Sequence, residues 1–365
     1  MKYIYYGLLV FVPLAIVGEF LGWPPLLVFA TAAIGVVPLA GWLGTATEEL
    51  AVHTGPRLGG LLNATLGNAA ELIITIVAIR AGALNPELRT GLNELVKASI
   101  TGSILGNVLL VLGFSILLGG LKNGTQRFDR RHAGVNSTML ILAVIALGVP
   151  SLFGHVIEAV DHDAVEYLSL GVAVVMMVVY GLSIVYAFGY PSSGAERKAE
   201  PPADEDTPHV ARWQVRTALG ILIASTLFIA WLSEILVGAV EPVVTQLGVT
   251  EFFLGIILVP LVGNVAEHLV GVQAALKNRM ELSLAISLGS SLQIALFVAP
   301  LLVFVSLLIG NPLTLVFNQF ELIALVGGAF IAALVALDGE SNWLEGAQLL
   351  VVYAIIGMAF FFLPT

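Results

Sequence analysis

The sequence contains no cysteine, and only 11% of its 365 residues carry a charged side chain. Without cysteine the chain can form no disulfide, thiolate metal site or cysteine nucleophile. The scarcity of charge, together with 58% apolar residues and a mean hydropathy of +0.98, excludes a soluble globular domain as the main part of the protein. The net charge of −10 argues against a nucleic-acid partner. We therefore expect an integral membrane protein, with the lipid bilayer as its main partner.

Long apolar runs recur along the whole chain, separated by short breaks of glycine, proline and charged residues. A hydrocarbon core about 30 Å thick needs about 20 apolar residues per helix, and irregular backbone is not tolerated against lipid. The runs therefore predict an all-α polytopic membrane protein with eleven transmembrane helices. The predicted spans are 4–21, 25–47, 59–80, 93–119, 136–153, 165–189, 214–238, 251–276, 282–309, 318–337 and 345–363.

Lysine and arginine are distributed unequally between the two faces that these spans define. Basic residues are enriched in cytoplasmic loops, so the richer face is predicted to be cytoplasmic. This places the protein in the cell membrane with its N-terminus in the cytoplasm and its C-terminus outside. Only Arg80, Arg89 and Lys97 lie on the outer face. The cytoplasmic basic residues are Lys2, Arg57, Lys122, Arg127, Arg130, Arg131, Arg197, Lys198, Arg212, Arg216, Lys277 and Arg279.

A hydrophilic stretch divides the chain into two halves with equal numbers of predicted spans. We predict an N-terminal transmembrane helix at residues 1–22, a first five-helix repeat at 23–190, a cytoplasmic acidic linker at 191–213, and a second five-helix repeat at 214–365. An odd number of helices per repeat means that the second repeat lies inverted in the membrane relative to the first.

Two motifs recur in the same order in both halves. The stretch LLNATLGNAAELI places Glu71 in the first half, and VPLVGNVAEHL places Glu267 in the second. The following helix carries Gly102 and Ser103 in SITGSILGN, and its counterpart carries a second Gly-Ser pair in AISLGSSLQ. Matching motifs in matching order are typical of inverted-repeat transporters, whose substrate sites lie near the midplane at the repeat interface.

Both motif glutamates lie deep inside predicted spans. An ionised carboxylate at that depth costs at least about 2.5 kcal/mol, so it is expected to face the protein interior and to have a partner. A protonated glutamate that only bonds a neighbouring helix is the alternative, but it would have to occur twice. A Gly-Asn pair precedes each glutamate by one turn, and a helix break there would free backbone carbonyls. These pairs are Gly67 with Asn68 and Gly263 with Asn264.

Carboxylate, amide and carbonyl oxygens together suit a hard cation, and flexible Ca²⁺ better than octahedral Mg²⁺. The alternative role for the glycines is tight helix packing. For the serines, joining neighbouring helices through their hydroxyl groups is as good an explanation as lining the site. His268 is expected either to share a proton with the site or to be an ordinary buried histidine. The remaining candidates for the cation pathway are Ser103, Asn107, Ser290, Gln293, Glu48 and Glu234.

The paired motifs resemble the signature repeats of the calcium/proton exchangers, a family of cation/proton antiporters in the cation/calcium exchanger superfamily. The resemblance extends over essentially the second to the eleventh predicted helices. It implies that Glu71 and Glu267 bind the cation and exchange protons, aided by the Gly-Ser motifs. It also implies that an acidic segment, helical in some relatives, corresponds to residues 196–206, although Pro201 and Pro202 interrupt it here.

We therefore expect a secondary active antiporter, not an enzyme, that exports Ca²⁺ from the cytoplasm in exchange for protons by alternating access. Ca²⁺ is then the transported ion and H⁺ the second substrate, and the chain is compatible with a homo-oligomer. Helices one, two, six and seven are expected to move past the motif helices. The alternatives are a sodium/calcium exchanger on the same repeats and a divalent cation channel with a carboxylate selectivity ring. An intramembrane hydrolase is disfavoured because no aspartate lies inside a predicted span.

Overall fold

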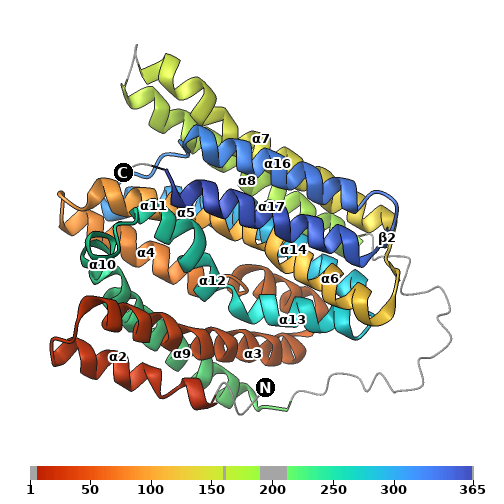
Figure 1. Ribbon diagram of the computed structural model, residues 1–365, viewed down its shortest axis with the longest axis horizontal. Helices are drawn as coiled ribbons and strands as arrows, with labels where there is room; N and C mark the ends of the chain where they lie inside the picture. The colour runs from red at the N-terminus through yellow and green to blue at the C-terminus, as the bar shows by residue number, and fades with distance from the viewer. Residues whose placement is uncertain (1–5, 159–161, 190–211, 364–365) are drawn as a thin grey trace.

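The structure is a computed structural model that describes residues 6–158, 162–189 and 212–363. Almost all of the predicted acidic linker at 191–213, including the segment 196–206, lies outside these residues. The described chain is a bundle of helices that run at varied tilts (Figure 1). Two short strands, β1 (Gln126–Arg127) and β2 (Glu340–Ser341), pair antiparallel and join the α6–α7 connection to the α16–α17 connection.

The helices follow the predicted apolar runs, with several of the runs divided. Those of the first half are α2 (Phe11–Phe20), α3 (Pro25–Leu66), α4 (Ala69–Leu84), α5 (Arg89–Leu105), the π-helix η1 (Gly106–Val111), α6 (Leu112–Asn123), α7 (Arg130–Glu158) and α8 (His162–Gly189). Those of the second half are α9 (Val215–Gly238), α10 (Val240–Leu247), α11 (Glu251–Phe253), η3 (Leu254–Leu258), α12 (Val259–Gly263), α13 (Val265–Leu276), α14 (Met280–Gln293), η4 (Ile294–Val298), α15 (Ala299–Ile309), α16 (Gln319–Val335) and α17 (Trp343–Phe361).

Within the part of the chain that the structure describes, fewer than the eleven expected helices are long and apolar enough to cross a membrane without a break. Among the described residues, seven helices are long and apolar enough to cross a membrane, or eight if the pair Val240–Leu247 and Glu251–Gly263, bent by 111°, counts as one. Three further apolar helices are shorter, at Tyr6–Phe20, Val265–Leu276 and Gln319–Val335. The count of eleven is therefore not confirmed. The motif spans fall short because their helices stop at Leu66 and Gly263 and begin again at Ala69 and Val265.

The predicted break between the second and third spans is present. The spans 25–47 and 59–80 were expected to be separate, and α3, although continuous in its label from Pro25 to Leu66, consists of two helices joined at a kink. The chain turns within it at Gly55, whose φ of 83° and ψ of 170° are non-helical. A positive φ of this size is accessible to glycine at little cost, which explains why the turn falls there.

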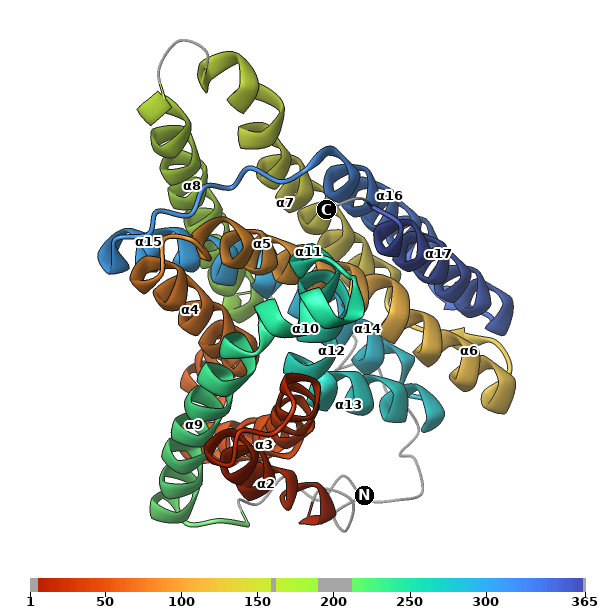
Figure 2. The ribbon, with the colours of Figure 1, turned by 60° about the vertical axis from the view of Figure 1, so that its left-hand side comes forward.

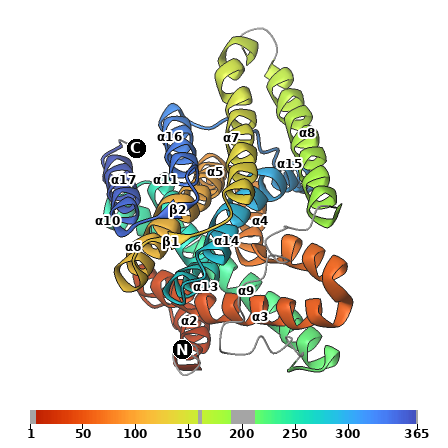
Figure 3. The ribbon, with the colours of Figure 1, turned by 90° about the vertical axis from the view of Figure 1, so that its right-hand side faces the viewer.

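The helices form a small group beside a larger one. In all three ribbon views α2, α3 and α9 lie side by side at one edge, and α7, α8, α16 and α17 lie farther away (Figures 2 and 3). The motif-bearing helices α4, α5, α13 and α14 lie between them (Figure 2). The expected grouping of the sixth span with the first, second and seventh is wrong, because α8 packs against α7, α15 and η4.

The two Gly-Ser helices have the same irregularity but different surroundings. Each passes into a π-helix within a turn of its motif, η1 after α5 and η4 after α14. A Cβ on Gly102 would overlap the carbonyl oxygen of Ile256, so α5 crosses η3 at backbone contact. A Cβ on the equivalent Gly289 would meet nothing within 4 Å. At Gly102, α5 is thus covered by η3 of the other repeat, whereas at Gly289, α14 faces open space.

This difference predicts unequal effects of adding one methyl group. Gly102→Ala forces α5 away from η3, and overpacking of this kind lowers the free energy of unfolding by about 1–3 kcal/mol. Gly289→Ala is the matched control, because its methyl group enters open space. Thermal unfolding of the purified variants is expected to show a lowered midpoint for Gly102→Ala only. Equal midpoints for both variants would contradict the described crossing.

Candidate functional site

Two helix breaks place the motif glutamates at the start of new helices. Asn68, with φ −97° and ψ 24°, precedes α4, and Asn264, with φ −109° and ψ 10°, precedes α13. Glu71 and Glu267 then occupy the first turns of these helices. The interruption expected at each Gly-Asn pair is therefore present. The positive ends of the two helix dipoles favour negative charge at these positions.

Glu71 is completely buried and receives hydrogen bonds from both repeats. Its Oε1 accepts from Ser103 Oγ at 2.5 Å and from Ser99 Oγ at 3.2 Å, both on α5. Its Oε2 accepts from Asn264 Nδ2 at 3.3 Å, across the repeat interface. These donors offset part of the cost of burying a carboxylate.

Glu267 has the equivalent contact in the second repeat. Its Oε2 accepts from Ser290 Oγ at 2.5 Å. Ser290 Oγ also lies 3.1 Å from Asn68 Oδ1 and accepts from Asn107 Nδ2 at 3.0 Å. A hydroxyl has a single proton to donate, so Ser290 can bond only one of its two acceptors at a time.

Each of the two asparagines donates a hydrogen bond to a residue of the other repeat. Asn264 Nδ2 donates to Ser103 Oγ at 2.9 Å, and Asn68 Nδ2 donates to Gln293 Oε1 at 3.0 Å. Each glutamate therefore shares a cluster with the serine of its own repeat and the asparagine of the other. We call these the Glu71 cluster, consisting of Glu71, Ser103 and Asn264, and the Glu267 cluster, consisting of Glu267, Ser290 and Asn68.

The motif glycines bring the clusters close together. A Cβ on Gly67 would lie 3.3 Å from Oε1 of both Glu267 and Gln293, and a Cβ on Gly263 would lie 3.3 Å from Cβ of Glu71. Each glycine thus lies against the glutamate of the opposite repeat. A larger residue at either position would occupy the space between the two halves of the site.

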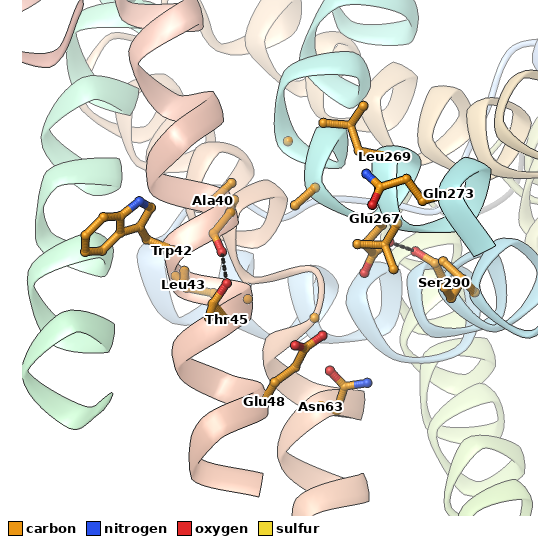
Figure 4. A pocket seen from close by; sticks show the side chains of 18 of the residues that line it. Ala40, Trp42, Leu43, Thr45, Glu48, Asn63, Glu267, Leu269, Gln273 and Ser290 are labelled. Atoms are coloured by element: carbon orange, nitrogen blue, oxygen red, sulfur yellow. Dashed lines mark hydrogen bonds between the residues drawn. The ribbon is translucent and has the colours of Figure 1, made fainter. Parts of the chain in front are cut away.

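A cavity of about 680 Å³ opens beside the Glu267 cluster. Glu267, Ser290 and Gln293 are among its lining residues, and Figure 4 shows Glu267 and Ser290 facing it together with Glu48 from α3. Glu71 does not line the cavity and has no exposed surface. In this conformation the cavity therefore reaches one carboxylate of the pair and not the other.

Three aromatic residues also line the cavity, which the sequence did not indicate. Tyr6, Trp42 and Trp213 line it, and the Trp42 ring centroid lies 5.7 Å from that of Tyr6 and 6.4 Å from that of Trp213. Glu49 accepts hydrogen bonds from the backbone N–H groups of Arg212 and Trp213. These residues are far apart in the chain, so no local pattern connects them.

The other predicted residues are distributed unevenly. Glu234 lies away from the cavity and forms an exposed ion pair with Arg80, at 3.0 Å. Nε2 of His268 is buried without a hydrogen-bond partner among the described residues, and it does not bond Glu267. Oδ1 of Asn107 and Oδ1 of Asn264 are likewise buried without a donor in the described part of the chain. These two amide oxygens are available as ligands.

The site is thus rich in oxygen atoms. It offers two carboxylates, amide oxygens and hydroxyls, and these are the ligand types that Ca²⁺ prefers. Within the described ranges no group of three or more His, Cys, Asp or Glu side chains is arranged to hold a metal ion. A cation here would therefore be bound by neutral oxygens as well as by the two carboxylates. Such a site suits a transported ion, which must be released after it has bound.

The chain matches one protein family and several characterised relatives. The family described as "Sodium/calcium exchanger protein" matches residues 24–189 and 217–362. The "Ca(2+)/H(+) antiporter" of Aphanothece halophytica is 43% identical over 99% of this chain and 97% of its own length. The protein of the same name from Synechocystis sp. is 44% identical over 99% and 98%. The solved structure of native YfkE is 37% identical, covers 98% of this chain and 100% of its own, and superposes with a TM-score of 0.81.

The unequal access to the two clusters can be tested with introduced thiols, because the natural chain has no cysteine. Ala266 lines the cavity, whereas Ala78 is completely buried. We expect Ala266→Cys to react with a membrane-impermeant maleimide added from the side on which Trp213 lies. Ala78→Cys is expected to react only after denaturation. Failure of Ala266→Cys to react in the folded protein would show that the cavity is closed, and labelling of folded Ala78→Cys would contradict its burial.

Proposed function

Because the chain belongs to the sodium/calcium exchanger protein family, we propose that it is a Ca²⁺/H⁺ antiporter, a transporter and not a catalytic enzyme, that moves Ca²⁺ out of the cytoplasm and protons in. Relatives named Ca(2+)/H(+) antiporter align over nearly the whole chain at 39–44% identity. The observation that carries the mechanism is the matched pair of clusters, each with one buried or partly buried carboxylate. Ca²⁺ is the transported substrate.

The paired glutamates explain why protons can compete with Ca²⁺. Two carboxylates in a poorly hydrated site repel each other, and no lysine or arginine bonds to either of them in the described structure. The pair is stabilised by one divalent cation or by protons. Coupled exchange follows if only the neutralised site can pass through the occluded form that separates the two open states.

The inverted repeats supply the second open state. In the described conformation the cavity reaches the Glu267 cluster and the Glu71 cluster is covered. Exchanging the roles of the repeats would cover Glu267 and open the space over Gly102. We propose that α2, α3 and α9, which pack together, move as one group relative to the motif helices.

We propose the following membrane topology for this cycle. The N-terminal helix (1–22) and the two five-helix repeats (23–190 and 214–365) cross eleven times, with the broken motif helices counted as single spans. The N-terminus and the linker (191–213) lie in the cytoplasm and the C-terminus outside. Trp213, at the end of the linker, lines the cavity, which under this topology supports a described conformation that opens to the cytoplasm.

Calcium uptake into proteoliposomes tests the exchange directly. The purified protein is given ⁴⁵Ca under an imposed pH gradient, an imposed sodium gradient, or neither. We expect accumulation only under the pH gradient, and we expect Glu71→Gln and Glu267→Gln to lower its rate roughly 10-fold or more, since each removes a charged ligand. Glu241→Gln, an exposed carboxylate on α10, is the matched control and is expected to transport normally.

The two alternatives predict different results in the same assay. Sodium-driven accumulation would place the chain with sodium/calcium exchangers. Equilibration of ⁴⁵Ca that is independent of any gradient would indicate a channel. Either result would contradict proton-coupled exchange.

A further inference from the structure

A third buried carboxylate lies outside the two clusters. Glu321, in the first turn of α16, is 2% exposed. Its Oε2 accepts from the backbone N–H of Asn318 at 2.8 Å, and Asn318 Oδ1 accepts from the N–H of Glu321 at 2.8 Å. This reciprocal capping box uses one carboxylate oxygen to stabilise the start of α16. The other oxygen has a different partner.

Oε1 of Glu321 accepts from Thr101 Oγ1 at 2.9 Å. Thr101 is completely buried on α5, midway between Ser99 and Ser103. Ser99 and Ser103 lie four residues apart on one face of the helix, and Thr101 lies on the opposite face. One turn of α5 is therefore bonded to Glu71 on one face and to Glu321 on the other.

A second bond joins the same two elements. Lys97 Nζ donates to the backbone carbonyl of Val316, just before α16, at 3.0 Å. Lys97 and Thr101 are four residues apart and share a helix face. Two contacts one turn apart fix both the rotation and the height of α5 against α16.

The second repeat has no copy of this arrangement. Since Ser103 corresponds to Ser290, Thr101 corresponds to Leu288, which is completely buried and apolar. The helix α14, whose Ser290 bonds Glu267, therefore has no hydroxyl at this point. The bond between Thr101 and Glu321 is therefore specific to the first repeat, and α5 connects it directly to Glu71 through Ser99 and Ser103.

We propose that Glu321 is a positioning residue for the ion site: through Thr101 it fixes the rotation of α5, so that Ser99 and Ser103 point at Glu71. This inference rests on the proposed antiport function. Removing either partner leaves a buried polar group unsatisfied, and α5 can then turn to satisfy it elsewhere. The geometry around Glu71, and with it the apparent affinity for Ca²⁺, changes, whereas the capacity of the protein to change conformation does not.

The test compares KM for Ca²⁺ and maximal rate in proteoliposomes under a fixed pH gradient. Glu321→Ala and Thr101→Val are expected to raise KM about 2- to 10-fold, as expected for one lost buried hydrogen bond, with the maximal rate within about twofold of wild type. The double variant is expected to be no worse than either single variant, because both remove the same interaction. Glu321→Gln and Thr101→Ser keep an acceptor and a hydroxyl, and each is expected to restore KM.

Glu345→Ala is the matched control. Glu345 forms an equivalent capping box with Asn342 at the start of α17, and its hydrogen bonds lie within that cap. It is expected to leave KM unchanged although it removes the same kind of cap. If Glu321→Ala does not fold, the comparison of Thr101→Val with Thr101→Ser decides alone.

Three results would separate failure of this inference from failure of the proposed function. An unchanged KM in Thr101→Val, or a Glu321→Gln variant as defective as Glu321→Ala, would overturn the positioning role, the latter by showing that the negative charge is what matters. An equal rise in KM in Glu345→Ala would also overturn it. Absence of pH-driven accumulation by the wild-type protein would instead contradict antiport itself.

Discussion

The structure depends on keeping two carboxylates inside a membrane protein without a permanent cationic partner among the described residues. Glu71 is fully buried and is held by two serines and one asparagine, and Glu267 is held by Ser290. Neutral donors lower the cost of the charged form without removing it. A bonded arginine or lysine would neutralise the site permanently. Because the donors are neutral, the charge remains available to a mobile cation or proton.

The other irregular features follow from this requirement. Each glutamate needs a helix start, and the breaks at Asn68 and Asn264 provide it. The broken halves are too short to cross a bilayer alone, so they must be enclosed by other helices. Glycine permits that enclosure where α5 crosses η3 at backbone contact. At the equivalent Gly289, α14 has no such close neighbour. The two Gly-Ser motifs therefore differ in one conformation: the first is covered and the second is open.

Local sequence patterns predicted the parts of the site but not how they join. The repeated Gly-Asn and glutamate pattern identified Glu71 and Glu267, and the Gly-Ser motifs identified Ser103 and Ser290. The reach of Asn264 to Glu71 across the repeat interface could not be predicted, because a contact between residues so far apart leaves no periodic signal. Glu321 carried a weak signal as a lone carboxylate early in an apolar run. The break between the second and third predicted spans was predicted and falls at Gly55. The number of complete spans is not confirmed, because a glycine in an apolar run can equally break a helix or allow close packing.

The central claim is that Ca²⁺ and protons compete for the same pair of carboxylates. Calorimetric titration of the purified protein with Ca²⁺, in buffers that differ in ionisation enthalpy, measures the protons released for each ion bound. At a pH where the pair is partly protonated, the account predicts that binding releases protons and that Glu71→Gln and Glu267→Gln reduce both the release and the affinity. Calcium binding of normal affinity with no proton release at any pH would contradict the claim.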